Sequence, residues 1–293
     1  VTIGEGATAV VLDGTNNTAV PGASFDATTG TLTLTDSINA DIYAANGKLI
    51  VKLDKENMTD EIVGENLVVA GEVEITGKGT LILSNKNNYN NRIISIEHTA
   101  VAGDIIGMSV TGQASVKSNE GNGNMVLSIG CNVSTGFTQD AAPAEAYFTV
   151  DTEGTVEFTR NGKTVAGFQY GKVQSFNVKK GTVIFTNNDS NANNPLVYMG
   201  CKNDTSWYPT ESGVVNVTGG KLELNTAGAG AALKLFGSNG NEINVSGGEL
   251  IAKNAATQEG TINGRGAEIN VTESGKMTLT ASTLKGVVAT IGD

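Results

Sequence analysis

Short runs in which apolar residues alternate with variable ones recur along this 293-residue chain, each directly after a glycine. The second and fourth residues after nine such glycines are all apolar, whereas the residue between them ranges from Thr33 to Glu223 and Ile251. A period of two residues with one constant apolar face is typical of β-strands that bury one side. The nine glycines are Gly30, Gly47, Gly79, Gly112, Gly154, Gly181, Gly220, Gly248 and Gly275.

Two further short strands are predicted in each repeat. One lies before the glycine, where two apolar residues flank a single polar residue. Another, looser strand lies earlier in the repeat and ends in glycine, as at Gly130, Gly200 and Gly237. Each repeat therefore reads as strand, glycine, loop, strand, glycine turn, strand and polar loop. The strand before the glycine is clearest in residues 176–178, 215–217, 243–245 and 269–271, and residues 148–150 fit the same frame.

The spacing of the repeat predicts a solenoid. Successive glycines are 17, 32, 33, 42, 27, 39, 28 and 27 residues apart, and such periods are characteristic of repeat folds. The two-residue period argues against helical repeats, the leucine-rich frame is absent, and propeller blades would be spaced more evenly. A sandwich of hairpins would place turns about every 8–12 residues. We therefore predict an all-β fold, a single-stranded right-handed parallel β-helix (β-solenoid) of about nine rungs, with glycines in its corners.

The two ends of the chain are expected to differ from its middle. Because Gly30 and Gly47 are too close for a full turn, residues 1–45 are predicted to form an irregular N-terminal start or cap. Residues 46–293 are predicted to form one continuous β-helix. The last residues stay apolar, so we expect that end to fold back as a cap or to contact another domain or subunit.

Charge and composition restrict the partners. The net charge is −11 and there are only three arginines, so nucleic acids and anionic membrane surfaces, which select clustered Lys and Arg, are disfavoured. No apolar run reaches the roughly 18 residues of a membrane span. The acidic composition, rich in Thr, Asn and Gly, favours an extracellular or cell-surface location. Glycans and surface proteins are the expected partners.

The cysteines and the histidine indicate neither a metal site nor a cofactor. Cys131 and Cys201 occupy equivalent places in repeats that are two rungs apart, about 9–10 Å, which exceeds the reach of a disulfide. We predict two free thiols, with an intermolecular disulfide as the alternative. Two cysteines and the single His98 are too few for a zinc site, and His98 is expected on the surface or in a loop.

Asparagines and aromatic residues are the candidates for polar function. Asn216, Asn244 and Asn270 share one outward position of the repeat and are predicted to stack as a ladder of amide hydrogen bonds. The insertions at 84–92, 138–147, 186–195 and 203–212 are predicted loops. Trp207 and Tyr208, with Tyr89 as a weaker candidate, could offer the aromatic face and polar neighbours that sugar binding uses. The alternative is that Trp207 closes its loop over the rod.

The chain resembles the pectate-lyase-like right-handed parallel β-helix domains of bacterial surface proteins, including adhesins and carbohydrate-binding proteins. The resemblance covers about residues 45–285 and depends on the glycine corners followed by alternating apolar residues. It departs from the enzymes of this architecture, which gather acidic and basic residues in a cleft. Here Glu157, Glu223 and Glu249 are expected in different columns or distant rungs, whereas glycoside hydrolysis needs two carboxyl groups about 5–9.5 Å apart.

The resemblance implies an extracellular binding or structural role. The favoured function is a non-catalytic, adhesin-like bacterial surface module that binds glycan or a cell-surface partner. One alternative is a self-assembling subunit of a surface fibre or layer that associates through its end rungs. The other is a polysaccharide lyase or hydrolase.

Overall fold

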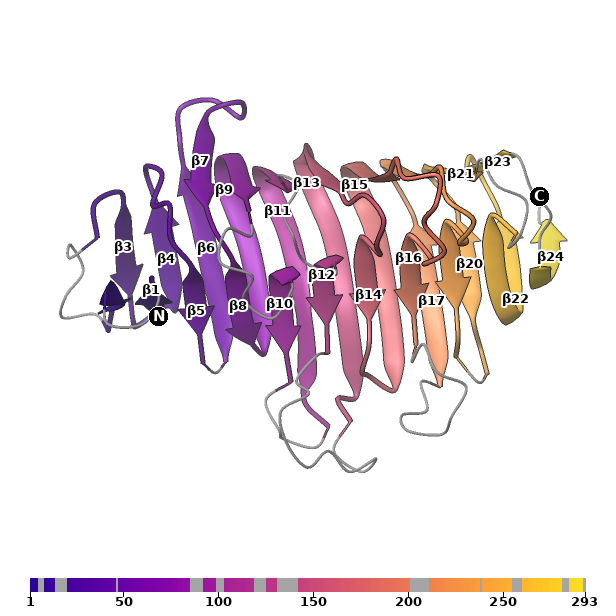
Figure 1. The fold of residues 1–293 in the computed structure, drawn as a ribbon, viewed down its shortest axis with the longest axis horizontal. Helices are drawn as coiled ribbons and strands as arrows, with labels where there is room; N and C mark the ends of the chain where they lie inside the picture. The colour runs from indigo at the N-terminus through magenta and orange to yellow at the C-terminus, as the bar shows by residue number, and fades with distance from the viewer. Residues whose placement is uncertain are drawn as a thin grey trace.

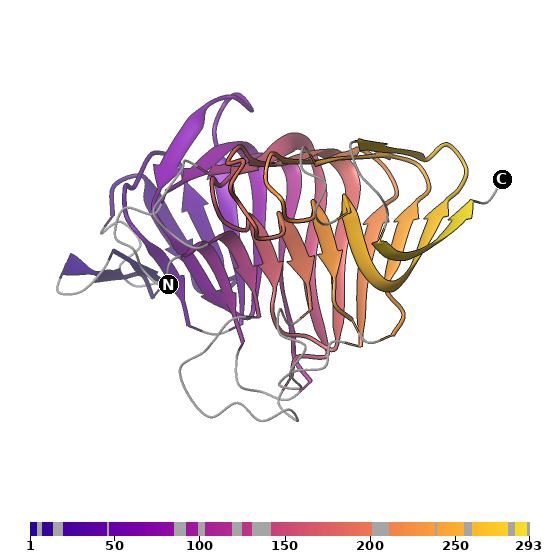
Figure 2. The ribbon, with the colours of Figure 1, turned by 45° about the vertical axis from the view of Figure 1, so that its right-hand side comes forward.

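The regular structure of the protein is built from β-strands. The computed structural model describes residues 1–4, 8–13, 20–45, 47–84, 92–98, 103–118, 125–130, 142–200, 211–237, 239–254, 260–280 and 285–291. These residues form 24 strands and no α-helix. The strands lie side by side along the long axis of an elongated molecule, with the N-terminus and the C-terminus at opposite ends (Figures 1 and 2).

Most strands belong to three ladders of parallel pairs, which we name leading, middle and trailing after their order within each pass of the chain. In the leading ladder, residues such as Ile94 lie in register with Leu67 of the previous pass and Leu127 of the next. This ladder comprises β5 (Ile42–Ala44), β8 (Leu67–Ala70), β10 (Arg92–Glu97), β12 (Met125–Ile129), β14 (Ala166–Phe168), β16 (Val197–Met199), β19 (Leu233–Leu235) and the first residues of β22 (Ile262–Val271).

The middle ladder is the longest of the three. Phe148, for example, lies in register with Met108 and Phe176. It comprises β4 (Thr31–Leu34), β6 (Lys48–Asp54), β9 (Glu72–Leu83), β11 (Ile105–Ser118), β13 (Glu145–Thr159), β15 (Val173–Asn187), β17 (Ser212–Val217), β20 (Glu242–Val245), the last residues of β22, and β24 (Lys285–Ile291).

The trailing ladder continues around the glycine corner from the middle one. It contains β7 (Glu61–Gly64), the second halves of β9, β11, β13 and β15, then β18 (Lys221–Thr226), β21 (Glu249–Asn254) and β23 (Lys276–Thr280). Three parallel strands per pass, in the predicted order, are consistent with a β-solenoid.

Antiparallel pairs are found only near the N-terminus among the described residues. There β1 (Thr2–Ile3) pairs with β2 (Val10–Val11) and with β5, and β3 (Ala23–Asp26) pairs with β4. Parallel pairing nevertheless starts within this region, because β4 pairs in parallel with β6. A domain boundary at residue 45 stays a prediction.

The register corrects part of the glycine alignment. Leu32 and Leu49, which follow Gly30 and Gly47, lie in the middle ladder, whereas the other aligned pairs lie in the trailing ladder. After Gly112, Val116 rather than Ala114 lies opposite Leu81. The error arose because all of these positions are apolar and a two-residue slip leaves the same face buried.

The interior is a set of apolar columns. Its centre contains five phenylalanines, all with 0% exposure: Phe148, Phe158, Phe168, Phe176 and Phe185. The ring of Phe176 lies 5.2 Å from that of Phe148, 5.8 Å from Phe185 and 6.2 Å from Phe168, measured between centroids. These separations suit favourable aromatic packing, so the aromatic cluster should make the middle of the rod its most stable part.

Glycine is required at the corners by a left-handed backbone, as at Gly112, by close approach between passes, or by both. A Cβ added at Gly154 would collide with the carbonyl oxygen of Ala114, and one at Gly275 with that of Val245. The glycines before the trailing strands therefore let successive corners stack directly upon one another, in addition to the turn conformations that were predicted for them.

Candidate binding face

The aromatic residues and cysteines singled out in the sequence lie outside the described residues. This applies to Trp207, Tyr208, Tyr89, Cys131 and Cys201. The proposed sugar-binding role of the three aromatics and the free state of the two thiols therefore stay predictions. We therefore describe a candidate site that lies on the outward face of the middle ladder.

The predicted asparagine ladder is confirmed. The Nδ2 of Asn216, Asn244 and Asn270 each donates to the Oδ1 of the asparagine in the preceding pass, at 2.8, 3.1 and 3.0 Å. The ladder begins one pass earlier than predicted, at Asn177, whose Nδ2 donates to Thr149 Oγ1 at 3.2 Å. Because strands of neighbouring passes lie roughly 4.8 Å apart, an amide can reach its equivalent in the next pass.

The amides are largely occupied with one another. Asn177 Nδ2 also donates to Ser175 Oγ at 3.2 Å, and Asn244 Nδ2 also donates to Glu242 Oε2 at 3.0 Å. The ladder is therefore first a structural feature, which fixes the register of the middle ladder and orders the polar side chains beside it.

An aromatic platform lies next to this ladder. Tyr147 of β13 crosses Gly107 of β11, and its hydroxyl donates to Glu72 Oε1 of β9 at 2.6 Å. A Cβ at Gly107 would lie 2.5 Å from Tyr147 Cδ1, so the missing side chain makes room for the ring. One half-buried ring thus spans three passes of the rod.

Acceptor groups surround this ring. Glu145 accepts a hydrogen bond from Ser175 Oγ at 3.2 Å, and Thr149 lies two residues after Tyr147 on the same outward face. Glu74 accepts from Thr111 Oγ1 at 2.9 Å and pairs with Lys48 Nζ at 3.1 Å. The platform therefore combines an apolar ring with carboxylate, hydroxyl and amide groups held on rigid strands.

The electrostatics of the platform keep the tyrosine protonated. Burial, the hydrogen bond to Glu72 and the negative charges of Glu72, Glu145 and Glu74 all raise the pKa of Tyr147 far above its usual value. The hydroxyl therefore stays a donor to Glu72 throughout the physiological pH range. The surplus of carboxylates favours neutral or cationic ligands over anionic ones.

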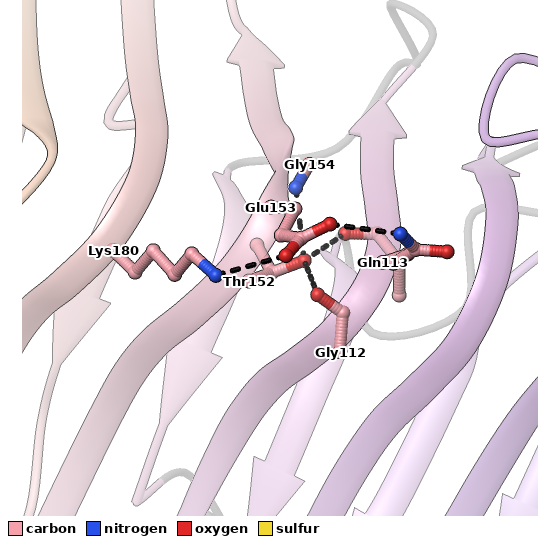
Figure 3. Close-up of polar contacts among 7 residues, drawn as sticks. Gly112, Gln113, Thr152, Glu153, Gly154 and Lys180 are labelled. Carbon is pink, nitrogen blue, oxygen red and sulfur yellow. Dashed lines mark hydrogen bonds and ion pairs between the residues drawn. The ribbon is translucent and has the colours of Figure 1, made fainter.

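A second polar group lies at the corner between the middle and trailing ladders (Figure 3). Glu153 accepts from Gln113 Nε2 at 2.8 Å and from Lys180 Nζ at 3.0 Å, which links three passes and lowers the pKa of Glu153. Beneath it, Thr152 Oγ1 lies 2.7 Å from the carbonyl oxygen of Ala114 and accepts from the Gly154 amide at 3.0 Å. These contacts fix the corner and leave Glu153 partnered.

Two of the three carboxylates considered for hydrolysis, Glu157 and Glu223, form ion pairs with lysines. Glu157 and Glu223 share one column, separated by Ile184, and Glu249 lies in a neighbouring column. Lys117 Nζ lies 3.8 Å from Glu157, and two lysines lie 2.6 and 3.0 Å from Glu223. Ion-paired outward carboxylates such as Glu157 and Glu223 are usual on a solvated sheet face.

His98 was expected on the surface or in a loop. It follows β10 directly, as expected of a loop residue, but it is only 3% exposed and so does not lie on the surface. Within the described residues, no group of three or more His, Cys, Asp or Glu side chains is arranged to hold a metal ion.

Sequence reasoning missed the Tyr147 platform because it assigned residues 138–147 to a loop. In the structure Glu145 and Tyr147 belong to β13. Their alternation with Ala146 and Phe148 was the available signal, since it continues the two-residue period of the strand.

No described segment is a helix that is long and apolar enough to cross a membrane. Compared with known proteins, the chain matches no protein-family model, no curated protein and no solved structure.

Proposed function

We propose that the chain is a single-stranded right-handed parallel β-helix of about nine rungs that acts as a non-catalytic surface module outside the cell, adhesin-like in role. Its partner is a glycan, either free or carried on a cell surface. The parallel ladders support the architecture, and the acidic, Arg-poor composition supports the location.

The observation that carries the binding role is the Tyr147 platform. A sugar ring presents an apolar face that packs on an aromatic ring, and hydroxyl groups that need polar partners at its rim. Tyr147 supplies the ring, while Glu145, Ser175 and Thr149 supply the rim. Because rigid strands position these groups, little ordering is needed on binding.

The asparagine ladder extends the platform along the rod. Its amides continue the outward column of Thr149 toward the C-terminal end. A ligand lying along this column would meet similar polar groups at each pass, which suits an extended neutral polysaccharide better than a compact molecule. The net charge of −11 and the carboxylates near Tyr147 disfavour polyanionic glycans.

Binding of the intact chain to an array of neutral and amine-bearing glycans tests the proposal. Tyr147→Ala should weaken binding about tenfold or more, equivalent to about 1.4 kcal/mol, because the platform is lost. Tyr147→Phe keeps the ring and should keep most of the binding. Circular dichroism of both variants shows whether the fold is intact.

Trp207→Ala separates the platform from the predicted loop site. Loss of binding in this variant alone would move the binding site to Trp207 and keep the general function. Binding to no glycan on the array would contradict the proposed function itself.

A further inference from the structure

Two exposed apolar side chains flank the carboxylate that lies beside the Tyr147 ring. Ile105 of β11 and Val173 of β15 lie in register with Glu145 of β13, one in the preceding pass and the other in the next. Both are unusually exposed for large hydrophobic residues, 49% for Ile105 and 38% for Val173. The half-buried ring of Tyr147 follows two residues after Glu145 on the same face. Apolar surface therefore borders Glu145 on three sides.

Within the described part of the chain, no lysine or arginine forms an ion pair with Glu145. Its partner is an uncharged group, the Ser175 hydroxyl, which donates to Oε1 at 3.2 Å. Lys48 lies on the same face, but its Nζ pairs with Glu74 at 3.1 Å. By contrast, Glu153 of the same strand has a lysine at 3.0 Å. Glu145 therefore presents an uncompensated negative charge to a ligand on the platform.

We propose, on the basis of the glycan-binding function proposed above, that the platform takes a sugar that carries a protonated amine. The ammonium group pairs with Glu145, and the apolar face of the sugar packs on the Tyr147 ring. An ammonium group near an aromatic face is also attracted by the ring. Ile105 and Val173 exclude water from the contact, and an ion pair is stronger where water is excluded.

Other classes of sugar suit this arrangement less well. A sugar acid would place its carboxylate beside Glu145 and near Glu72 and Glu74, whose negative charges repel it. A neutral sugar offers Glu145 only hydroxyl donors, and hydrogen bonds between a carboxylate and a charged donor are stronger. An amino sugar supplies the positive charge and keeps its hydroxyl groups for Thr149 and the asparagine ladder. The platform therefore selects the amine.

Oligomers of glucosamine and of N-acetylglucosamine with equal length are the matched ligands, because acetylation removes the charge of the amine. Calorimetric titration of the intact chain, at low salt and at a pH that keeps the amine protonated, should show about tenfold tighter binding of the glucosamine oligomer. Added salt should reduce this preference, because it screens a partly exposed ion pair. Equal affinities, or tighter binding of the acetylated oligomer, would overturn the proposal.

Glu145→Gln tests the site, because it removes the charge and keeps the size of the side chain. The ratio of the two affinities should fall from about tenfold to near one in this variant. Glu157→Gln is the matched control, since Glu157 is another outward glutamate of β13 and is 46% exposed; it should keep the preference. A preference that survives Glu145→Gln, or that Glu157→Gln abolishes equally, would overturn the proposal. Circular dichroism checks that both variants are folded.

An oligolysine peptide of the same charge tests whether an amine alone is enough. It should bind more weakly than the glucosamine oligomer, because a lysine side chain has no flat apolar face to pack on Tyr147. Equal or tighter binding of the peptide would overturn the assignment of an amino sugar. Equal binding of the two sugar oligomers would refute the amine preference and leave glycan binding intact, so this inference and the proposed function can fail separately.

Discussion

At the level of single residues, the corners show how a small side chain determines the fold. Gly154 is needed because the carbonyl oxygen of Ala114 occupies the space that a Cβ would fill. Beside it, the hydroxyl of buried Thr152 binds the backbone of the pass below. At such corners, glycine recurs in the sequence because the corners of successive passes stack closely on one another.

Gly154→Ala should therefore lower the free energy of unfolding by about 1–3 kcal/mol, since the corner must shift to relieve the collision. The matched control is Gly64→Ala in β7, where the nearest atom to an added Cβ is the flexible Leu83 Cδ2 at 3.3 Å. Urea denaturation of both variants provides the measurement. Equal stability of the two variants would contradict this account of the corner.

At the level of strands, outward side chains pair along and between neighbouring elements. Glu223 of β18 lies 2.6 Å from Lys221 on the same strand and 3.0 Å from Lys253 of β21. It also accepts from Asn225 Nδ2 at 3.1 Å. Such a cluster ties two strands together while the carboxylate is charged.

This cluster gives a pH-dependent contribution to stability. The hydrogen bonds from Lys221 and Lys253 lower the pKa of Glu223 from 4.5 to about 2. The folded state therefore holds the ionised form more strongly than the unfolded state does, and the added stability, complete above pH 4.5, is lost as the pH falls toward 2.

Glu223→Gln should destabilise the protein by roughly 0.5–1 kcal/mol above pH 4.5, a value reduced by solvent screening, and by almost nothing near pH 2. Urea denaturation across this range measures the difference. Glu157→Gln is the control, because Glu157 is 46% exposed and lies 3.8 Å from its lysine. A penalty for Glu223→Gln that does not change with pH would refute the assignment.

At the level of the whole molecule, stability should vary along the rod. The middle contains the phenylalanine cluster and strands with neighbours on both sides, whereas β23 has one described neighbour. In stacked folds each pass contacts mainly its neighbours, so end passes open more readily than central ones.

Amide hydrogen exchange should therefore be slowest in β13 and β15 and faster in β23, which has one described neighbour. Mass spectrometry of peptides from each strand can follow the exchange. Exchange in β13 and β15 as fast as that in β23 would contradict this account of the rod.

The sequence predicted correctly those features of the fold that a local pattern of residues encodes. The alternation of apolar residues predicted the β-strands and their inward faces, and Asn216, Asn244 and Asn270 were correctly placed in one outward column. The same alternation could not fix the register after Gly112, because a slip of two residues changes no face. The alternation also continues through Tyr147, but it does not indicate the contact with Glu72, which lies 75 residues away in the sequence.

The order of residues along the chain was enough to predict the β-rich repeat, its inward apolar faces and the charge, because each depends on local pattern and composition. Contacts between passes became visible only in three dimensions, because loops of variable length separate the residues that meet. The ring of Tyr147 over Gly107 and the buried position of His98 are both of this kind. They depend on which pass lies beside which, and no short stretch of sequence contains that information.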